Sequence, residues 1–258
     1  MDNSRKAYHK LCAEFYDISK PFACDAEVNF YAKILKGVQG PVLEAMCGSG
    51  RLLLPLLRLG FHIDGLDNSS EMLESCEKRC QAENLTTLLL NQPIESLSLK
   101  KYALIFIAVG SFQLISDRLE ALKVLKILHS HLLPGGALIL DTFIPWDSIK
   151  ESIEGDSLSK DRKTISSNRC IVCPDGAEIS LTSMTAIDPR EQLEISNSQY
   201  EKRIDDKVIS REGEELIVRW YYPYELELFL EKAGFSKVQI SEQAFVHNPN
   251  SIVYRAEV

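Results

Sequence analysis

Residues 41–57 read PVLEAMCGSGRLLLPLL, and this stretch decides the fold. Its apolar run at 42–45 predicts a short buried strand. Gly48 and Gly50 follow, and glycine takes left-handed backbone conformations at no steric cost. An apolar helical pattern begins directly afterwards, with Pro55 in the first turns, where proline is least costly. Strand, glycine turn and helix form the first unit of a nucleotide-binding α/β fold, with the amides at the helix start facing a polar ligand.

The residues around this turn narrow the choice of ligand. A dinucleotide-binding fingerprint would place a third glycine at Leu53, and a phosphate-binding loop would end in Gly-Lys-Ser/Thr, which is absent. Instead, Glu44 ends the first strand and Asp67 ends the next apolar run. A carboxylate at Asp67 suits a ribose diol, because its two oxygens accept hydrogen bonds from two hydroxyls. An acid at Glu44 suits a cationic group. S-adenosylmethionine is a nucleoside that carries positive charge and no phosphate, and it fits both acids.

Four motifs occur in order along the chain, and together they carry a family resemblance. They are Glu44–Leu52, Gly65–Leu73, Ile105–Phe112 and Leu132–Ala137. With these motifs the chain resembles the class I S-adenosylmethionine-dependent methyltransferases that act on small molecules. The resemblance covers nearly the whole chain. It implies a methyltransferase that transfers a methyl group from S-adenosylmethionine to a nitrogen or oxygen of a small-molecule acceptor.

The chain departs from the pattern of this family at three places. Met46 stands where the family often has glycine, so we expect the backbone beside the cofactor to be shaped differently. Asn91 and Gln92 close the third strand, where the family often has an acid that meets adenine. Ala103 opens the fourth strand in place of an acid. None of these departures removes the cofactor site.

Most of the residues predicted to bind the cofactor follow the carboxyl ends of the strands, where ligands of such sheets bind. Tyr16 is added from the resemblance alone, as part of a leading segment that covers the cofactor. The predicted cofactor-binding residues are Tyr16, Glu44, Ala45, Gly48, Gly50, Arg51, Asp67, Asn68, Met72, Gln92, Pro93, Ile94, Ala108, Val109 and Gly110.

The predicted acceptor contacts are Ser111, Phe112, Gln113, Trp146 and Tyr221. Packing at the rim of the pocket is an equal alternative for Phe112 and Trp146, and Tyr221 faces either the pocket or the core. His247 is a further candidate for which a surface position is the simpler interpretation. No catalytic residue is assigned, because methyl transfer depends mainly on holding the acceptor behind the methyl group, and a base is optional.

Composition limits the remaining possibilities. The chain has 258 residues, enough for one α/β domain with an insertion, and a formal net charge of −8. An acidic chain argues against general nucleic-acid binding. We expect a cytoplasmic protein, since there is no membrane-spanning apolar run and no signal peptide. The seven cysteines are expected to be reduced. Cys170 and Cys173 are expected to flank a turn, and no metal site is predicted because further ligands are missing.

The order of the expected elements predicts a doubly wound, mostly parallel seven-stranded sheet of the Rossmann-like type in a single domain, 1–258. Helices are expected over 4–35, with a break at Pro21, and residues 1–38 are expected to form a helical lid. The expected strands are 42–45, 61–66, 86–90, 104–109 and 137–142. They are separated by a helix at 51–59, a helix capped by Ser69 or Ser70 that ends near 83, and a helix capped by Ser116 or Asp117 that runs to about 131. A helix at 224–233 and an antiparallel pair at 236–243 and 251–257 are expected to close the chain.

The segment 155–222 interrupts this order. Its alternating pattern and turn signals predict antiparallel strands at 163–173, 178–187, 192–204 and 210–222, with one solvated face. We expect this insertion to form a cap that builds the acceptor pocket, a homodimer surface, or both. Two other functions stay open at this point. One is a nicotinamide-dinucleotide oxidoreductase, and the other is a non-catalytic binding module that keeps the fold.

Overall fold

The computed structural model describes residues 9–97, 100–154, 164–242, 245 and 248–258, and its chain divides into two compact units. One unit comprises 22–144 with 220–258, and the other comprises 1–21 with 145–219. The expected lid at 1–38 is therefore divided between the two units. No helix in the described ranges is both long and apolar enough to cross a membrane.

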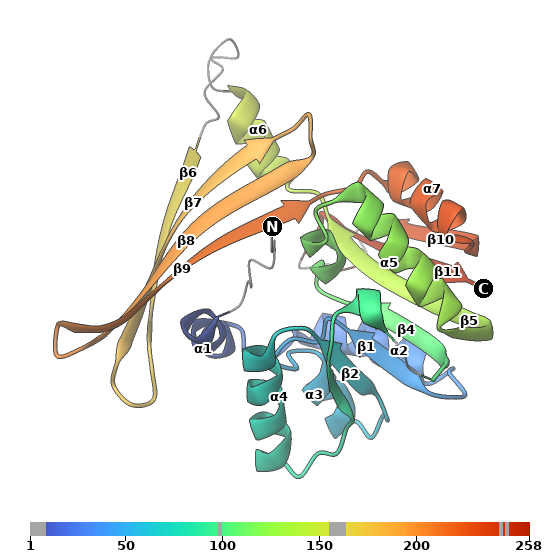
Figure 1. Ribbon diagram of the computed structural model, residues 1–258, viewed down its shortest axis with the longest axis horizontal. Coiled ribbons are helices and arrows are strands. Elements are labelled where there is room, and N and C mark those ends of the chain that lie inside the picture. Colours follow the sequence, from blue (N-terminus) through green and yellow to red (C-terminus); the bar gives the residue numbers. More distant parts are fainter. Residues whose placement is uncertain (1–8, 98–99, 155–163, 243–244, 246–247) are drawn as a thin grey trace. The chain divides into compact units, whose positions relative to one another are not determined.

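The unit containing 22–144 is built on a seven-stranded sheet in the order β10-β11-β5-β4-β1-β2-β3 (Figure 1). Neighbours from β5 to β3 pair in parallel, whereas β11 pairs antiparallel with both β5 and β10. This confirms the predicted fold class. The strands are β1 (Val42–Ala45), β2 (Asp64–Asp67), β3 (Leu89–Asn91), β4 (Tyr102–Ile107), β5 (Leu132–Phe143), β10 (Ser236–Glu242) and β11 (Ser251–Glu257).

Helices cover both faces of this sheet. They are α2 (Asp25–Leu35), α3 (Leu53–Arg58), α4 (Ser70–Ala82), α5 (Arg118–Ser130) and α7 (Pro223–Ala233), with short 3-10 helices η1 (Ile94–Ser96) and η2 (Ser111–Leu114). Alternate strand residues, such as Val42, Leu104 and Phe106, share a core with buried residues of α2, α3 and α4. The strand residues between them point to the opposite face, where α5 and α7 pack against each other (Figure 1).

Local signals in the sequence place several helix ends correctly. Ser69 caps α4, with its Oγ accepting from the Met72 amide at 3.2 Å. Asp117 caps α5 through the amides of Leu119 and Glu120. Gly234 ends α7 in the left-handed region, with a φ of 107°. These are the caps that side-chain acceptors and glycine favour at helix N- and C-termini.

Strand β2 begins at Asp64 and not at 61, as the apolar pattern predicts. The reason lies in the end of the preceding helix. The Phe61 amide donates to the Leu56 carbonyl, and Gly60 has a φ of 85°. Residues 60–61 therefore close α3 in the manner of a glycine-terminated helix and do not extend the strand.

The other unit contains α1 (Lys10–Ser19), α6 (Trp146–Glu154) and an antiparallel sheet in the order β6-β7-β8-β9. Leu11, Cys12 and Phe15 of α1 share a core with Leu181 of β7 and Tyr200 of β8. The predicted antiparallel insertion is thus present, while α6 is a helix that the polar pattern after Trp146 did not predict. The strands are β6 (Thr164–Val172), β7 (Glu178–Asp188), β8 (Leu193–Ile204) and β9 (Lys207–Arg219).

Candidate functional site

Three acidic side chains project from the same face of the parallel sheet at the carboxyl ends of its strands. Glu44 of β1 is in register with Gly65 of β2 and, across β4, with Ile139 of β5. Asp67 and Asp141 each lie two residues further along their own strands. Side chains two residues apart on a strand share a face. The register therefore gathers Glu44, Asp67 and Asp141 at the edge where the sequence predicts the ligand.

The loop after β1 uses its two glycines differently. Gly50 has a φ of 81°, and a Cβ there would lie 2.2 Å from Cδ1 of Leu54 and 2.7 Å from Sγ of Cys76. Gly48 has a φ of 54°, and a Cβ there would meet no heavy atom within 4 Å. Gly50 is thus fixed by packing within the protein, whereas Gly48 leaves room for a ligand to approach the backbone.

Asp67 holds this loop from the neighbouring strand. Its Oδ2 accepts a hydrogen bond from the Gly48 amide at 2.8 Å, and its Oδ1 accepts one from the Ser69 amide at 2.9 Å. Burial raises the pKa of the carboxyl, and these backbone hydrogen bonds partly offset the rise. A carboxylate accepts about four hydrogen bonds, so Asp67 can still accept one from a ligand.

The departure at Met46 does not change the backbone in the expected way. Met46 has a φ of 61° and so adopts the left-handed conformation that glycine would take. For a residue with a Cβ this conformation costs about 1–2 kcal/mol. The strain is retained beside the predicted cofactor loop, as is common near functional sites.

Glu44 is a buried carboxyl with an unsatisfied oxygen. The residue is 4% exposed, and its Oε2 has no hydrogen-bond partner. Burial raises its pKa well above the usual value, and the charges of Asp141 and Asp67 raise it further. A buried acid without a partner is costly. Its chemistry at this position fits a ligand that brings a cation or a hydrogen-bond donor.

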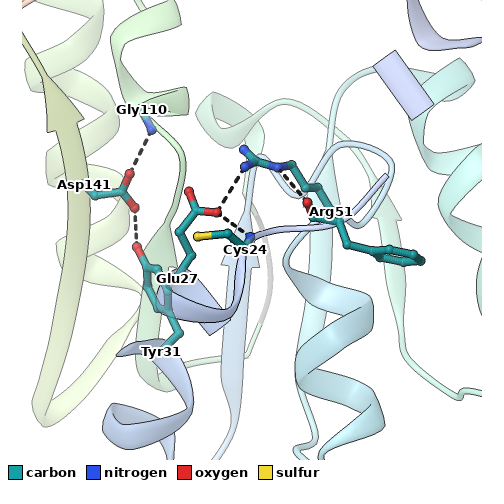
Figure 2. A network of polar contacts seen from close by, with 7 residues as sticks. Cys24, Glu27, Tyr31, Arg51, Gly110 and Asp141 are labelled. Carbon is teal, nitrogen blue, oxygen red and sulfur yellow. Dashed lines mark hydrogen bonds and ion pairs between the residues drawn. The ribbon is translucent and has the colours of Figure 1, made fainter. Parts of the chain in front are cut away.

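Asp141 is a site residue to which sequence reasoning assigned no role. It is 6% exposed, its Oδ2 accepts from the Gly110 amide at 3.0 Å, and its other oxygen accepts from the Tyr31 hydroxyl (Figure 2). Val109 and Gly110, which follow β4, both have positive φ, at 59° and 70°. Burial raises the pKa of Asp141 to about 6 against the opposing effect of these hydrogen bonds. Asp141 therefore holds the turn after β4 as Asp67 holds the loop after β1.

A second set of contacts attaches α2 to the glycine loop (Figure 2). Oε2 of Glu27 accepts from the Cys24 amide at 2.9 Å and from Nη2 of Arg51 at 3.1 Å. The Ala23 amide also donates to the Arg51 carbonyl at 2.9 Å. Sequence reasoning predicted Arg51 but missed Glu27. The glutamate at the third helical position, with its carboxylate on the cap amide, is a capping-box signal that could have identified it.

Gln92 directly follows the third strand and lies beside Asp67. The Gln92 amide donates to the Asp67 carbonyl at 3.0 Å, and the side-chain Nε2 is buried without a partner. The other residues predicted for the cofactor in this unit lie along the same edge and differ in exposure. Ala45, Met72, Ile94, Ala108 and Gly110 are buried, while Asn68, Pro93 and Val109 are exposed. Tyr16 belongs to α1, in the other unit.

The predicted acceptor contacts take different positions. Gln113 is fully buried, and its amide forms a pair of hydrogen bonds with the Phe143 backbone, at 2.9 and 2.8 Å. Phe112 and Tyr221 have no exposed surface, and their ring centroids are 5.9 Å apart, so both pack as core residues. Ser111 is half-buried at the start of η2, Trp146 is 47% exposed at the start of α6 in the other unit, and His247 lies outside the described residues.

Comparison with known proteins agrees with this arrangement. Residues 42–136 match the family model for a methyltransferase domain. This part of the chain is therefore similar to a methyltransferase domain. The match includes the glycine loop, Glu44, Asp67 and the turn at Val109 and Gly110, and it confirms the resemblance drawn from the sequence motifs. A comparison with curated protein sequences gave no match.

Solved structures share the fold over most of the chain. An S-adenosylmethionine-dependent methyltransferase from Clostridium acetobutylicum is 18% identical with a TM-score of 0.73, covering 95% of this chain and 97% of its own. The sugar N-methyltransferase KedS8 from Streptoalloteichus is 15% identical with a TM-score of 0.72, over 94% and 90%. The amino pentose methyltransferase CalS10 from Micromonospora echinaspora is 14% identical with a TM-score of 0.67, over 98% of both chains.

Proposed function

We propose that this methyltransferase uses S-adenosylmethionine as its donor and methylates a nitrogen or oxygen of a small-molecule acceptor. The observation that carries the proposal is the buried carboxyl of Glu44, whose Oε2 has no partner and which lies on the same face of the sheet as Asp67 and Asp141. Such a cluster of acids favours a cationic ligand. S-adenosylmethionine carries an ammonium group and a sulfonium in addition to its nucleoside.

The other features of the edge fit the rest of this donor. The remaining acceptor position of Asp67 suits a ribose hydroxyl. The unpartnered Nε2 of Gln92 is a donor suited to a ring nitrogen of adenine, in place of the acid that the family often has. Gly48 leaves space for close approach to the backbone. A dinucleotide fits less well, because its pyrophosphate would bring negative charge to the acids around the loop.

The chain contributes binding and orientation to the proposed reaction. S-adenosylmethionine supplies an electrophilic methyl group, and its transfer turns the sulfonium into a neutral thioether. Glu44 and Asp67 hold the donor, while Asp141 fixes the turn at Val109 and Gly110 beside it. Holding the acceptor in line with the methyl group is a proximity effect worth several kcal/mol. A neutral amine needs no base, whereas a hydroxyl generally does.

Amines are the first acceptors to test. A sugar N-methyltransferase and an amino pentose methyltransferase have this fold, and they support an amine acceptor. The sheet β6–β9 as an acceptor cap or homodimer surface, and the cytoplasmic location, also stay predictions.

Calorimetry with the full chain tests the proposal. We expect binding of S-adenosylmethionine and S-adenosylhomocysteine, and none of NAD. Glu44→Gln is expected to weaken binding of the donor at least tenfold, while Glu120→Gln, an exposed acid on α5 paired with Lys123, leaves it unchanged. Failure of both nucleosides to bind at millimolar concentration would refute the donor assignment.

A screen with isotopically labelled donor then tests catalysis. Amino sugars and other small amines are offered first, followed by matched compounds carrying a hydroxyl in place of the amine. Transfer of the label to any of them supports the enzyme. Binding of the donor without transfer to any small molecule in a broad metabolite extract would favour the non-catalytic module.

A further inference from the structure

We infer that Glu44 and Asp141 link donor binding to proton release, and that this link makes the ratio of donor to product affinity rise with pH. The inference rests on the proposed function and deepens it. It assigns to Asp141, which no sequence motif marks, a part in distinguishing the two ligands. The geometry behind it is the gathering of buried acids on one face of the sheet at the ligand edge.

The groups that face this cluster come from every element packed around it. Strands β1, β2 and β5 contribute Glu44, Asp67 and Asp141, and α2 contributes Glu27 and Tyr31. The thiol of Cys47 lies in the same field, and burial raises its pKa well above the usual value, so it stays neutral. Among the described residues, Arg51 contributes a cation to this set, and its Nη2 pairs with Glu27.

The cluster therefore carries more negative than positive charge when all its acids are ionised. Burial and the charges of Asp141 and Asp67 raise the pKa of Glu44 well above its usual value, which favours its protonated form in the empty site. The Asp141 carboxylate keeps its charge more easily, because it accepts hydrogen bonds from Tyr31 and from the Gly110 amide. A cation bound among these groups lowers their pKa values again. The proton leaves to the solvent as the cation binds.

The two ligands differ in the charge that drives this release. The donor carries one positive charge more than the product, because methyl transfer leaves the bonding electron pair on sulfur and removes the sulfonium charge. The ammonium and carboxylate groups are common to both. Donor binding is therefore expected to release more protons than product binding, and donor affinity should rise more steeply with pH.

The test is calorimetric titration of the full chain with S-adenosylmethionine and with S-adenosylhomocysteine, in two buffers of different ionisation enthalpy at the same pH. The difference in heat between the buffers gives the number of protons released. We expect a larger number for the donor. We also expect the ratio of donor to product affinity to rise between pH 6 and 8, by up to about tenfold per pH unit for each extra proton released.

Two variants assign the protons to residues. Glu44→Gln and Asp141→Asn keep an acceptor oxygen and lose the ionisable group, so each should reduce the excess proton release and the pH dependence of the ratio. Glu120→Gln is the matched control and should change neither. If a variant fails to fold, the numbers of protons that the unmodified protein releases on binding each ligand still test the inference.

The outcomes separate this inference from the proposed function. If neither nucleoside binds, the proposed function fails. If both bind with equal proton release and a ratio that does not change with pH, the donor assignment stands and the proton link is overturned.

Discussion

The paired substitutions Gly48→Ala and Gly50→Ala separate the folding role of the glycine loop from its binding role. Both glycines have positive φ, at 54° and 81°. A Cβ in the left-handed region costs about 1–2 kcal/mol. Part of this cost is offset, because alanine restricts the unfolded chain by about 0.4–1 kcal/mol relative to glycine. Backbone strain alone therefore predicts about 1 kcal/mol of destabilisation at either position.

Packing distinguishes the two positions. At Gly50 the new Cβ would overlap Cδ1 of Leu54 at 2.2 Å and Sγ of Cys76 at 2.7 Å, both within the core. Overpacking of this kind adds about 1–3 kcal/mol. At Gly48 the new methyl group meets no heavy atom within 4 Å. We therefore expect a loss of about 1 kcal/mol for Gly48→Ala and about 2–4 kcal/mol for Gly50→Ala.

Thermal unfolding with and without S-adenosylmethionine measures both roles. At about 2–4 °C per kcal/mol, the midpoint should fall by a few degrees for Gly48→Ala and by roughly 5–15 °C for Gly50→Ala. Gly48→Ala should also lose most of the ligand-induced rise in the midpoint, because its methyl group occupies the space left for the ligand. A Gly48→Ala protein that binds the donor with unchanged affinity would refute the assignment of this space to the ligand.

Three further predictions concern the groups around the site. The pKa of Asp141 is about 6 in the folded protein against 3.8 for the free group, so the folded state binds more protons than the unfolded state between these pH values. The stability of the ligand-free protein against urea should therefore fall from pH 5 to 7, and this group contributes up to about 3 kcal/mol over its full titration. The fall in stability should be smaller in Asp141→Asn. Tyr31→Phe removes a donor to the same carboxylate and should cost about 1.5–3 kcal/mol at pH 7, with a smaller loss at pH 5, where Asp141 is protonated; equal urea midpoint shifts at the two pH values would contradict this. Gln113→Leu leaves the amide and carbonyl of Phe143 without their partner and should cost about 2–5 kcal/mol; an unchanged melting temperature with a raised KM for the acceptor would instead place Gln113 in the acceptor site.

Features that depend on local chemistry could be predicted from the sequence. Gly48 and Gly50 indicate the loop after the first strand, because few other residues adopt its backbone conformation. Ser69 and Asp117 indicate where helices begin, because their side chains accept hydrogen bonds from backbone amides two or three residues away. The role of Asp67 in ligand binding could be predicted because this residue ends an apolar run. In each case the residues that interact are close along the chain or belong to a motif of fixed spacing.

Features that depend on distant partners could not be predicted in this way. Tyr31 and Asp141 are 110 residues apart, and no spacing rule connects a tyrosine in the second helix with the end of the fifth strand. The amide of Gln113 looked available for an acceptor, but Phe143, 30 residues later, satisfies both its donor and its acceptor. The predicted start of β2 was wrong because the end of α3 uses the same residues, and an apolar pattern does not show which of the two elements forms there.

The two loops of the site are each held by an aspartate on the neighbouring strand, so a substitution of either aspartate has two effects. Asp67 on β2 accepts from the Gly48 amide after β1, and Asp141 on β5 accepts from the Gly110 amide after β4. Each acid thus fixes the loop of the neighbouring strand and also adds to the negative charge of the site. Replacement by alanine would remove both effects together, whereas replacement by asparagine removes the charge and keeps one acceptor oxygen, which can still hold the loop amide. A donor affinity that falls with asparagine, while the midpoint of unfolding is kept, therefore reports charge, and a further fall with alanine reports the loop.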